Sequence, residues 1–276
     1  MSWHAQLQID YSVEQGRTVA RHKHKGPLRV LQSLYPEGDV ICHNVLVHPP
    51  GGLVGGDTLT IDITASGSAH GLLTTPGATR FYRCAAERAC QHTQISLADQ
   101  ARLEWLPLEA IAYNQCQAEN HLVLKLARQA ELIGWDITAF GLPGATLPFR
   151  QGRFLQHIEV PGVWLERGYL DATDTRLMDG PSGLAGQRCL ASLFFVSGAA
   201  LERQRREAGL ELARQIIARH ALNATAGVTC PNRQVMVLRV LSPLVEPAIH
   251  LLRQVWLGWR AHFWQLPAVS PRIWST

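Results

Sequence analysis

The sequence predicts a mainly β protein with two helices in its last third, and three observations support this prediction. Apolar residues alternate with polar ones in short runs through the first two thirds of the 276 residues. Glycine and proline clusters separate these runs, as turns separate strands. Helical spacing of apolar residues begins only near residue 200. No linker or low-complexity segment interrupts the chain, so we expect a single domain over residues 1–276.

Period-two alternation marks the predicted strands, because successive side chains of a strand point to opposite faces of a sheet. The clearest run is 59–65, in which Leu59, Ile61 and Ile63 alternate with threonine and aspartate. Residues 234–241 are apolar on both faces and rich in β-branched residues, which predicts a buried strand. Further alternating runs occupy residues 3–11, 101–105, 122–126 and, more weakly, 154–158.

The first predicted helix spans residues 201–222. This segment contains no proline, and Ala208, Leu212 and Ile216 recur every four residues. At 3.6 residues per turn, such a segment forms a helix of about six turns.

The second predicted helix begins at Ser242 and Pro243, which are residue types of a helix N-cap and first turn. It carries Trp256, Trp259 and Phe263. Large amphipathic aromatics serve both cores and interfaces, so this stripe either packs in the core or faces a partner.

The composition excludes several classes of protein. Lys and Arg number 26 against 22 Asp and Glu, and the net charge of +4 forms no basic stripe with interleaved aromatics. Nucleic-acid binding is therefore not expected. The longest apolar stretch, residues 190–201, is shorter than the roughly 20 residues of a membrane helix. With no secretory signal pattern and six cysteines that form no C-x-x-C pair, we expect a cytoplasmic protein with reduced thiols.

A glycine-rich loop, HPPGGLVGGD, covers residues 48–57. Four glycines in six positions indicate backbone angles or close approaches that other residues cannot adopt. The loop either brings backbone or solvent close to Asp57, or it is a tight turn in which Asp57 bonds its own backbone. It is not a phosphate-binding loop, since no Gly-Lys-Ser/Thr follows.

The sequence shows no complete metal site and no catalytic set. His22 and His24 would share one face of a strand, and they are the candidate metal ligands. A stable site needs three or four ligands, so we expect no tightly bound metal. Neither a G-x-S-x-G elbow nor an H-E-x-x-H helix is present.

Several segments occur together in the order and at the spacing of one known family, the UreD (UreH) urease accessory proteins, which the chain resembles from about residue 26 to its end. No single segment is decisive, and the joint order and spacing are specific. Arg80 stands where many relatives carry lysine, which keeps the charge but replaces an ammonium by a planar guanidinium. The segments are 26–29 (GPLR), 34–37 (LYPE), 48–57, 73–83 (LTTPGATRFYR), 103–107 (LEWLP), 109–111 (EAI), 134–136 (GWD), 164–168 (WLERG) and 271–274 (PRIW).

The resemblance implies a superhelical, solenoid-like β scaffold with two helices in the C-terminal third. It also implies a protein that is not an enzyme but binds apo-urease and the accessory protein UreF. Through UreF the scaffold would connect to the nickel-carrying GTPase UreG. Nickel would be held only in transit, so no tightly bound cofactor is expected.

The candidate residues for ion transit or loop function are polar members of the matched segments. Asp57, with few side chains expected to shield it, would either pair with Arg80 or line the ion's route with it. Two alternatives stay open, a β-solenoid hydrolase that uses Asp57 and a structural adaptor with no metal role. The complete set of candidates is Asp57, Thr74, Thr75, Arg80, Tyr82, Asp136 and Glu166.

Overall fold

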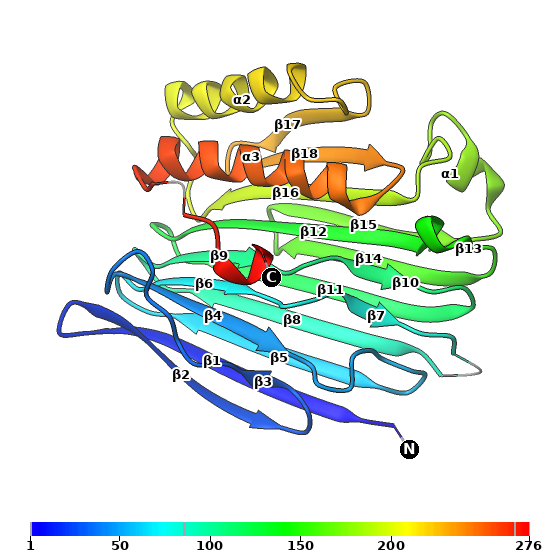
Figure 1. Ribbon diagram of the computed structural model, residues 1–276. Helices are drawn as coiled ribbons and strands as arrows, with labels where there is room; N and C mark the ends of the chain where they lie inside the picture. The colour runs from blue at the N-terminus through cyan, green and yellow to red at the C-terminus, as the bar shows by residue number, and fades with distance from the viewer. Residues whose placement is uncertain (1, 85–86, 268, 276) are drawn as a thin grey trace.

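The computed structural model describes residues 2–84, 87–267 and 269–275, and it contains two β-sheets and a layer of helices (Figure 1). The first sheet has seven strands in the order β15-β14-β11-β8-β5-β1-β2. These strands are β1 (His4–Glu14), β2 (Arg17–Lys25), β5 (Thr58–Ala65), β8 (Ala89–Leu97), β11 (Cys116–Leu126), β14 (Gly152–Val160) and β15 (Trp164–Asp171).

The second sheet has eleven strands, eight of them in the order β17-β18-β16-β12-β9-β6-β4-β3. The short strands β7 and β10 continue it in parallel beside β12, and β13 pairs with the end of β12. Its strands are β3 (Arg29–Val30), β4 (Ile41–Val47), β6 (His70–Thr74), β7 (Thr79–Phe81), β9 (Arg102–Leu106), β10 (Ala110–Ala112), β12 (Glu131–Leu142), β13 (Leu147–Pro148), β16 (Cys189–Ser197), β17 (Ala226–Asn232) and β18 (Val235–Ser242).

The chain alternates between the two sheets and so builds a β-solenoid of about four turns. The pairs β5–β8, β8–β11 and β11–β14 are parallel in the first sheet. The pairs β4–β6, β6–β9 and β9–β12 are parallel in the second. The predicted mainly β, solenoid-like scaffold is therefore confirmed. The single domain over residues 1–276 stays a prediction.

Two hydrophobic clusters explain the strand patterns. The first lies between the sheets and takes the inward residues of alternating strands, such as Leu59, Ile61 and Ile63 of β5. The second lies between the larger sheet and the helices. Strand β12 contributes Leu132 to the first cluster and Ile133 to the second, which is why it is apolar on both faces.

The two predicted helices are present as α2 (Arg203–Ala218) and α3 (Val245–Trp264), and they lie side by side against the larger sheet (Figure 1). Trp256 and Trp259 are fully buried and Phe263 nearly so, which decides in favour of core packing for this stripe. No described helix has both the length and the apolar character needed to span a membrane.

The predicted N-cap of the second helix is wrong. Ser242 is the last residue of β18 and pairs with Cys189 of β16, so it belongs to the sheet ladder. The residue before the helix is Leu244, whose backbone is extended and whose side chain gives no capping bond. The residue types at 242 and 243 suggested a helix start because the local sequence does not show that Ser242 pairs with another strand.

Three short elements were not predicted. Helix α1 (Thr175–Asp179) follows β15, and Asp174 caps it by accepting from the N–H of Leu177 at 3.0 Å. Two single 3₁₀ turns, η1 (Pro143–Ala145) and η2 (Arg272–Ser275), complete the described elements. All six cysteines are free, as expected.

Candidate functional site: a polar path between the sheets

A carboxylate lies between the two sheets at Asp136 of β12, which is 8% exposed. Its Oδ1 accepts hydrogen bonds from Gln156 Nε2 at 2.5 Å and Thr138 Oγ1 at 3.3 Å. Its Oδ2 accepts from Asn120 Nδ2 at 3.0 Å. Burial raises the pKa of Asp136 to about 6, against the opposing effect of these donors, and the nearby charge of Glu166 adds to the rise. Neutral donors hold this acid, and no cation of the described residues pairs with it.

Two partners of Asp136, Asn120 and Gln156, belong to a row of amide side chains on the inner face of the smaller sheet. Gln91 of β8, Asn120 of β11 and Gln156 of β14 occupy equivalent positions, because the strand registers pair Asn120 with both of the others. Gln91 Nε2 donates to Asn120 Oδ1 at 3.3 Å. The inner face of this sheet is otherwise largely apolar, so the row forms a polar line across the core.

Two neighbouring cavities follow this polar line. The inner one, about 20 Å³, is lined by Asp136, Asn120, Gln91 and Thr79 among others, and it has room for about one water molecule. The outer one is about 250 Å³ in volume. Because Thr79 and Gln91 line both cavities, these two side chains separate the outer space from Asp136.

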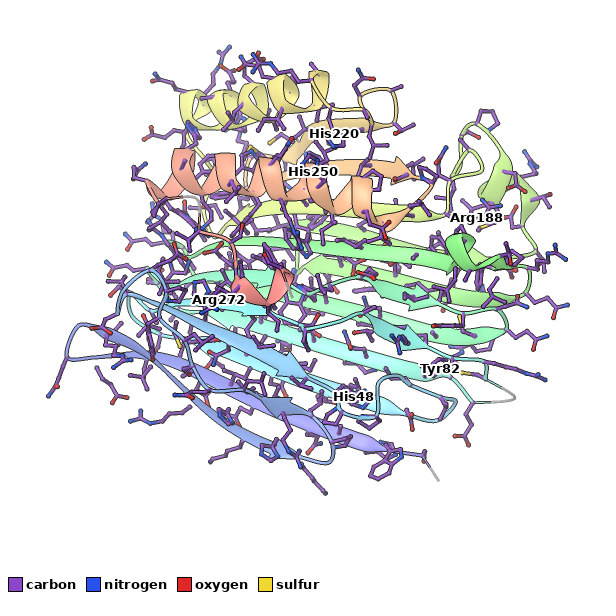
Figure 2. All side chains as sticks on the ribbon, in the orientation of Figure 1. His48, Tyr82, Arg188, His220, His250 and Arg272 are labelled. Atoms are coloured by element: carbon purple, nitrogen blue, oxygen red, sulfur yellow. The ribbon has the colours of Figure 1, made fainter. Side chains whose placement is uncertain are left out.

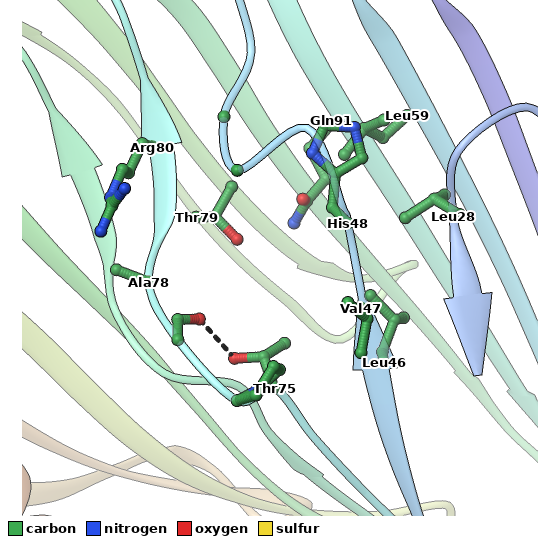
Figure 3. A pocket seen from close by; sticks show the side chains of 14 residues that line it. Leu28, Leu46, Val47, His48, Leu59, Thr75, Ala78, Thr79, Arg80 and Gln91 are labelled. Carbon is green, nitrogen blue, oxygen red and sulfur yellow. Dashed lines mark hydrogen bonds between the residues drawn. The ribbon is translucent and has the colours of Figure 1, made fainter. Parts of the chain in front are cut away.

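The outer cavity lies at the glycine-rich loop (Figure 3), and His48 lines it beside Thr75 and Arg80. His48 follows the end of β4 and is half-buried (Figure 2). Burial lowers the pKa of His48, although the charge of Asp57 opposes the shift. The imidazole is therefore neutral near pH 7, the form that can bind a passing cation.

Asp57 closes the glycine-rich turn. Its Oδ2 accepts from the N–H of Val54 at 2.9 Å, and its Oδ1 accepts from the N–H of Trp3 at 2.8 Å. The prediction that Asp57 would be poorly shielded is wrong, since it is only 4% exposed. The start of the chain covers it, which local sequence could not indicate. Arg80 is exposed and forms no ion pair with Asp57, so the pair that we considered is also wrong.

Thr74 and Thr75 bind backbone and neighbouring side chains. Thr74 Oγ1 donates to the carbonyl of Leu106 at 2.7 Å and accepts from Trp274 Nε1 at 2.8 Å. Thr75 Oγ1 accepts from the N–H of Leu108 at 2.9 Å and donates to the carbonyl of Gly77 at 3.0 Å. Thr75 also lines the outer cavity, whereas Thr74 lines a separate cavity of about 240 Å³ beside Tyr35 and Pro271.

Tyr82 explains one of the glycines in the loop. A Cβ at Gly52 would lie 2.3 Å from Tyr82 Cε2 and 2.9 Å from the carbonyl oxygen of Arg80. The expected close approach therefore occurs here, with the Tyr82 ring in turn packed on Tyr113 at 4.9 Å between centroids. Tyr82 supports the loop and does not line either cavity.

The remaining candidates do not line the inner or the outer cavity. Glu166 of β15 forms an ion pair with Arg239 of β18, and it affects Asp136 only through its charge. His22 and His24 are exposed on β2 with their rings stacked at 6.4 Å. Among the described residues no three His, Cys, Asp or Glu side chains stand where they could hold a metal ion.

A family model described as UreD urease accessory protein matches residues 4–275 of the chain. The chain belongs to the UreD family. It is 66% identical to the urease accessory protein UreD of Polaromonas naphthalenivorans and 65% identical to that of Variovorax paradoxus. It is 46% identical to the UreD of Methylibium petroleiphilum, and each comparison covers 100% of both chains. The family predicted from the ordered segments is thus confirmed.

Four polar residues of this UreD-family chain were missed in the sequence: Thr79, Gln91, Asn120 and Gln156. One local signal was available for Asn120, because Ala118, Leu122 and Leu124 share its face of β11 and are apolar. A polar residue on an otherwise apolar face is an informative exception. Gln156 breaks the face of Phe154 and Ile158 in the same way.

Proposed function

We propose that this chain is a non-catalytic accessory protein of urease maturation, and that nickel ions pass through it along the polar path between its sheets. The observation that carries the proposal is Asp136, a buried carboxylate held by neutral donors beside a cavity that fits one water molecule. Membership of the UreD family supports the role in urease maturation. The working environment would be the cytoplasm, without nucleic acid or membrane as a partner.

The chemistry of the path suits transport better than storage. The outer cavity offers the neutral imidazole of His48, and the path continues with amide and hydroxyl oxygens to one carboxylate. Imidazole and oxygen donors bind nickel, and a site with few protein ligands leaves most of the ion's coordination sphere to water. An ion held in this way can also leave, which is what delivery to another protein requires.

The proposed partners are apo-urease and UreF, with the GTPase UreG joined through UreF. In this arrangement nickel is cargo and the chain is a scaffold. The hydrolase alternative has little support, since both oxygens of Asp57 accept backbone N–H groups in a turn. The adaptor alternative predicts normal urease activity in a strain that lacks this chain.

The test is Asp136→Asn in a host that co-expresses urease and the accessory proteins. We expect an intact complex, less nickel in the recovered urease and a parallel fall in urease activity. Asp62→Asn, an exposed aspartate on β5, is the matched control and should behave as wild type. Unchanged nickel content and activity in an intact Asp136→Asn complex would contradict the proposed route.

A further inference from the structure

The outer face of the seven-stranded sheet carries a column of three histidines, His92 on β8, His121 on β11 and His157 on β14. The strand registers pair His121 with both of the others. The ring centroids of His92 and His121 are 4.7 Å apart, and those of His121 and His157 are 5.1 Å apart. Each histidine directly follows a member of the inner amide row, so the column lies on the opposite side of the sheet.

Two of these imidazoles have a carboxylate at one ring nitrogen. His121 Nε2 lies 3.2 Å from Glu119 Oε2, and His157 Nε2 lies 2.9 Å from Glu159 Oε2. In each pair the residues are two apart on one strand, so they share its outer face. In a neutral imidazole, a carboxylate at Nε2 holds the ring proton on Nε2, which leaves the Nδ1 lone pair free. Metal-binding histidines usually show this arrangement.

The free nitrogen of His157 needs a partner that the structure does not supply. Its Nδ1 is buried and has no hydrogen bond, while the side chain as a whole is 12% exposed. His92, which is exposed, forms no side-chain hydrogen bond within the described residues.

We propose that His121 and His157, joined by His92, form a surface site for a divalent transition-metal ion such as Ni²⁺ or Zn²⁺. Imidazole nitrogen is a preferred ligand of these ions. Neighbouring rings of the column are tilted by 34° and 32° to each other, and among the described residues no three donors converge on one point. Binding therefore requires the rings to turn toward one metal ion, which His92 can do because its side chain forms no hydrogen bond within the described residues. The sheet separates this site from Asp136, so the inference does not depend on the proposed function.

The competing explanation is a purely structural ladder, since aromatic rings in contact across neighbouring strands stabilise a sheet by themselves. The double variant His121→Phe/His157→Phe separates the two explanations. It keeps two neighbouring rings of similar size but removes their nitrogen donors. His4→Asn, which removes a lone exposed histidine from β1 of the same sheet, is the matched control.

The experiment is calorimetric titration of tag-free protein with NiCl₂ and with ZnCl₂ at pH 7.5. We expect the wild type, His4→Asn and Asp136→Asn each to bind one equivalent of metal ion. The double Phe variant should lose this equivalent. Glu159→Gln should weaken this equivalent by about 10–100-fold, because it removes the carboxylate that orients His157. Bound metal should raise the melting temperature of wild type and not that of the double Phe variant.

An unchanged isotherm in the double Phe variant, or no binding of either ion by wild type, would overturn the site. If the double Phe variant fails to fold, X-ray absorption of the zinc-loaded wild type decides the matter. Two or three imidazole ligands would support the site, and coordination by oxygen alone would overturn it. Loss of this equivalent in Asp136→Asn would place the metal on the interior path instead.

Discussion

Arg260 and Glu37 form a buried ion pair across 223 residues of sequence, in which Arg260 Nη2 lies 2.9 Å from each carboxylate oxygen of Glu37. Arg260 belongs to α3, and Glu37 lies in the segment before β4. On its other side, Arg260 Nε lies 3.1 Å from Glu104 Oε2, close enough for charge attraction but not aligned for a hydrogen bond. His43 contacts Glu37 at 2.8 Å and His70 contacts Glu104 at 2.9 Å. One cation thus joins the last helix to two parts of the solenoid.

Arg260→Met should destabilise the protein by about 3–5 kcal/mol, because it leaves two buried carboxylates without their shared cation. Urea unfolding followed by circular dichroism measures the change. Arg203→Ala is the control, since it removes only an exposed pair with Glu207 on α2, and its unfolding midpoint should match wild type. An Arg260→Met midpoint equal to that of wild type would show that the network contributes nothing.

Strands and helices could be predicted from the sequence where one face of the element is buried, because the apolar residues of that face then recur at a regular spacing. Strand β5 and helix α2 are such elements. It could not predict which strands become neighbours, and Gln91 joins Asn120 only through the register of β8 and β11. For the same reason Arg260 and Glu37 carry no local signal of their contact. The solenoid itself was expected from the ordered family segments and not from periodicity.

Asp136→Asn should remove a pH dependence of stability. The folded pKa of Asp136, about 6, exceeds its ordinary value of 3.8, so the folded state binds the proton more tightly than the unfolded state. Stability therefore falls as pH rises from about 4 to about 6, by up to about 3 kcal/mol. The Asn variant should lack this component, so its stability relative to wild type should increase over that range. Urea midpoints of both proteins at pH 4, 5, 6 and 7 test it, and parallel curves would contradict the assignment.

Gly209→Ala should destabilise the protein, although alanine is the better helix former. A Cβ at Gly209 of α2 would lie 2.3 Å from Phe263 Cζ of α3 and 3.3 Å from Met236 Cε. Phe263 cannot move away easily, because it packs on Phe195 at 4.2 Å between centroids. Overpacking of this kind costs about 1–3 kcal/mol, more than the gain in helix propensity of about 0.5–1 kcal/mol.

The control for Gly209→Ala is Gly227→Ala, where nothing lies within 4 Å of the added Cβ. Its stability should stay within about 0.5 kcal/mol of wild type. Thermal melts of both variants compare the two positions. A higher melting temperature for Gly209→Ala would mean that α2 and α3 separate readily.

Asp57→Asn should loosen the glycine-rich turn and the start of β1 together. The carboxylate accepts one backbone N–H with each oxygen, from Val54 and from Trp3, whereas an asparagine has only one oxygen to offer. One of these N–H groups would then face an amide NH₂, at a cost of about 1–3 kcal/mol. Hydrogen exchange should show faster exchange of the Val54 and Trp3 amides, with Asp62→Asn unchanged as the exposed control. Wild-type exchange at both amides would show that the carboxylate does not hold the turn. Because Asp57 lines neither cavity, any loss of urease activation in this variant should follow the loss of folded protein, whereas Asp136→Asn should lose activation in an intact complex.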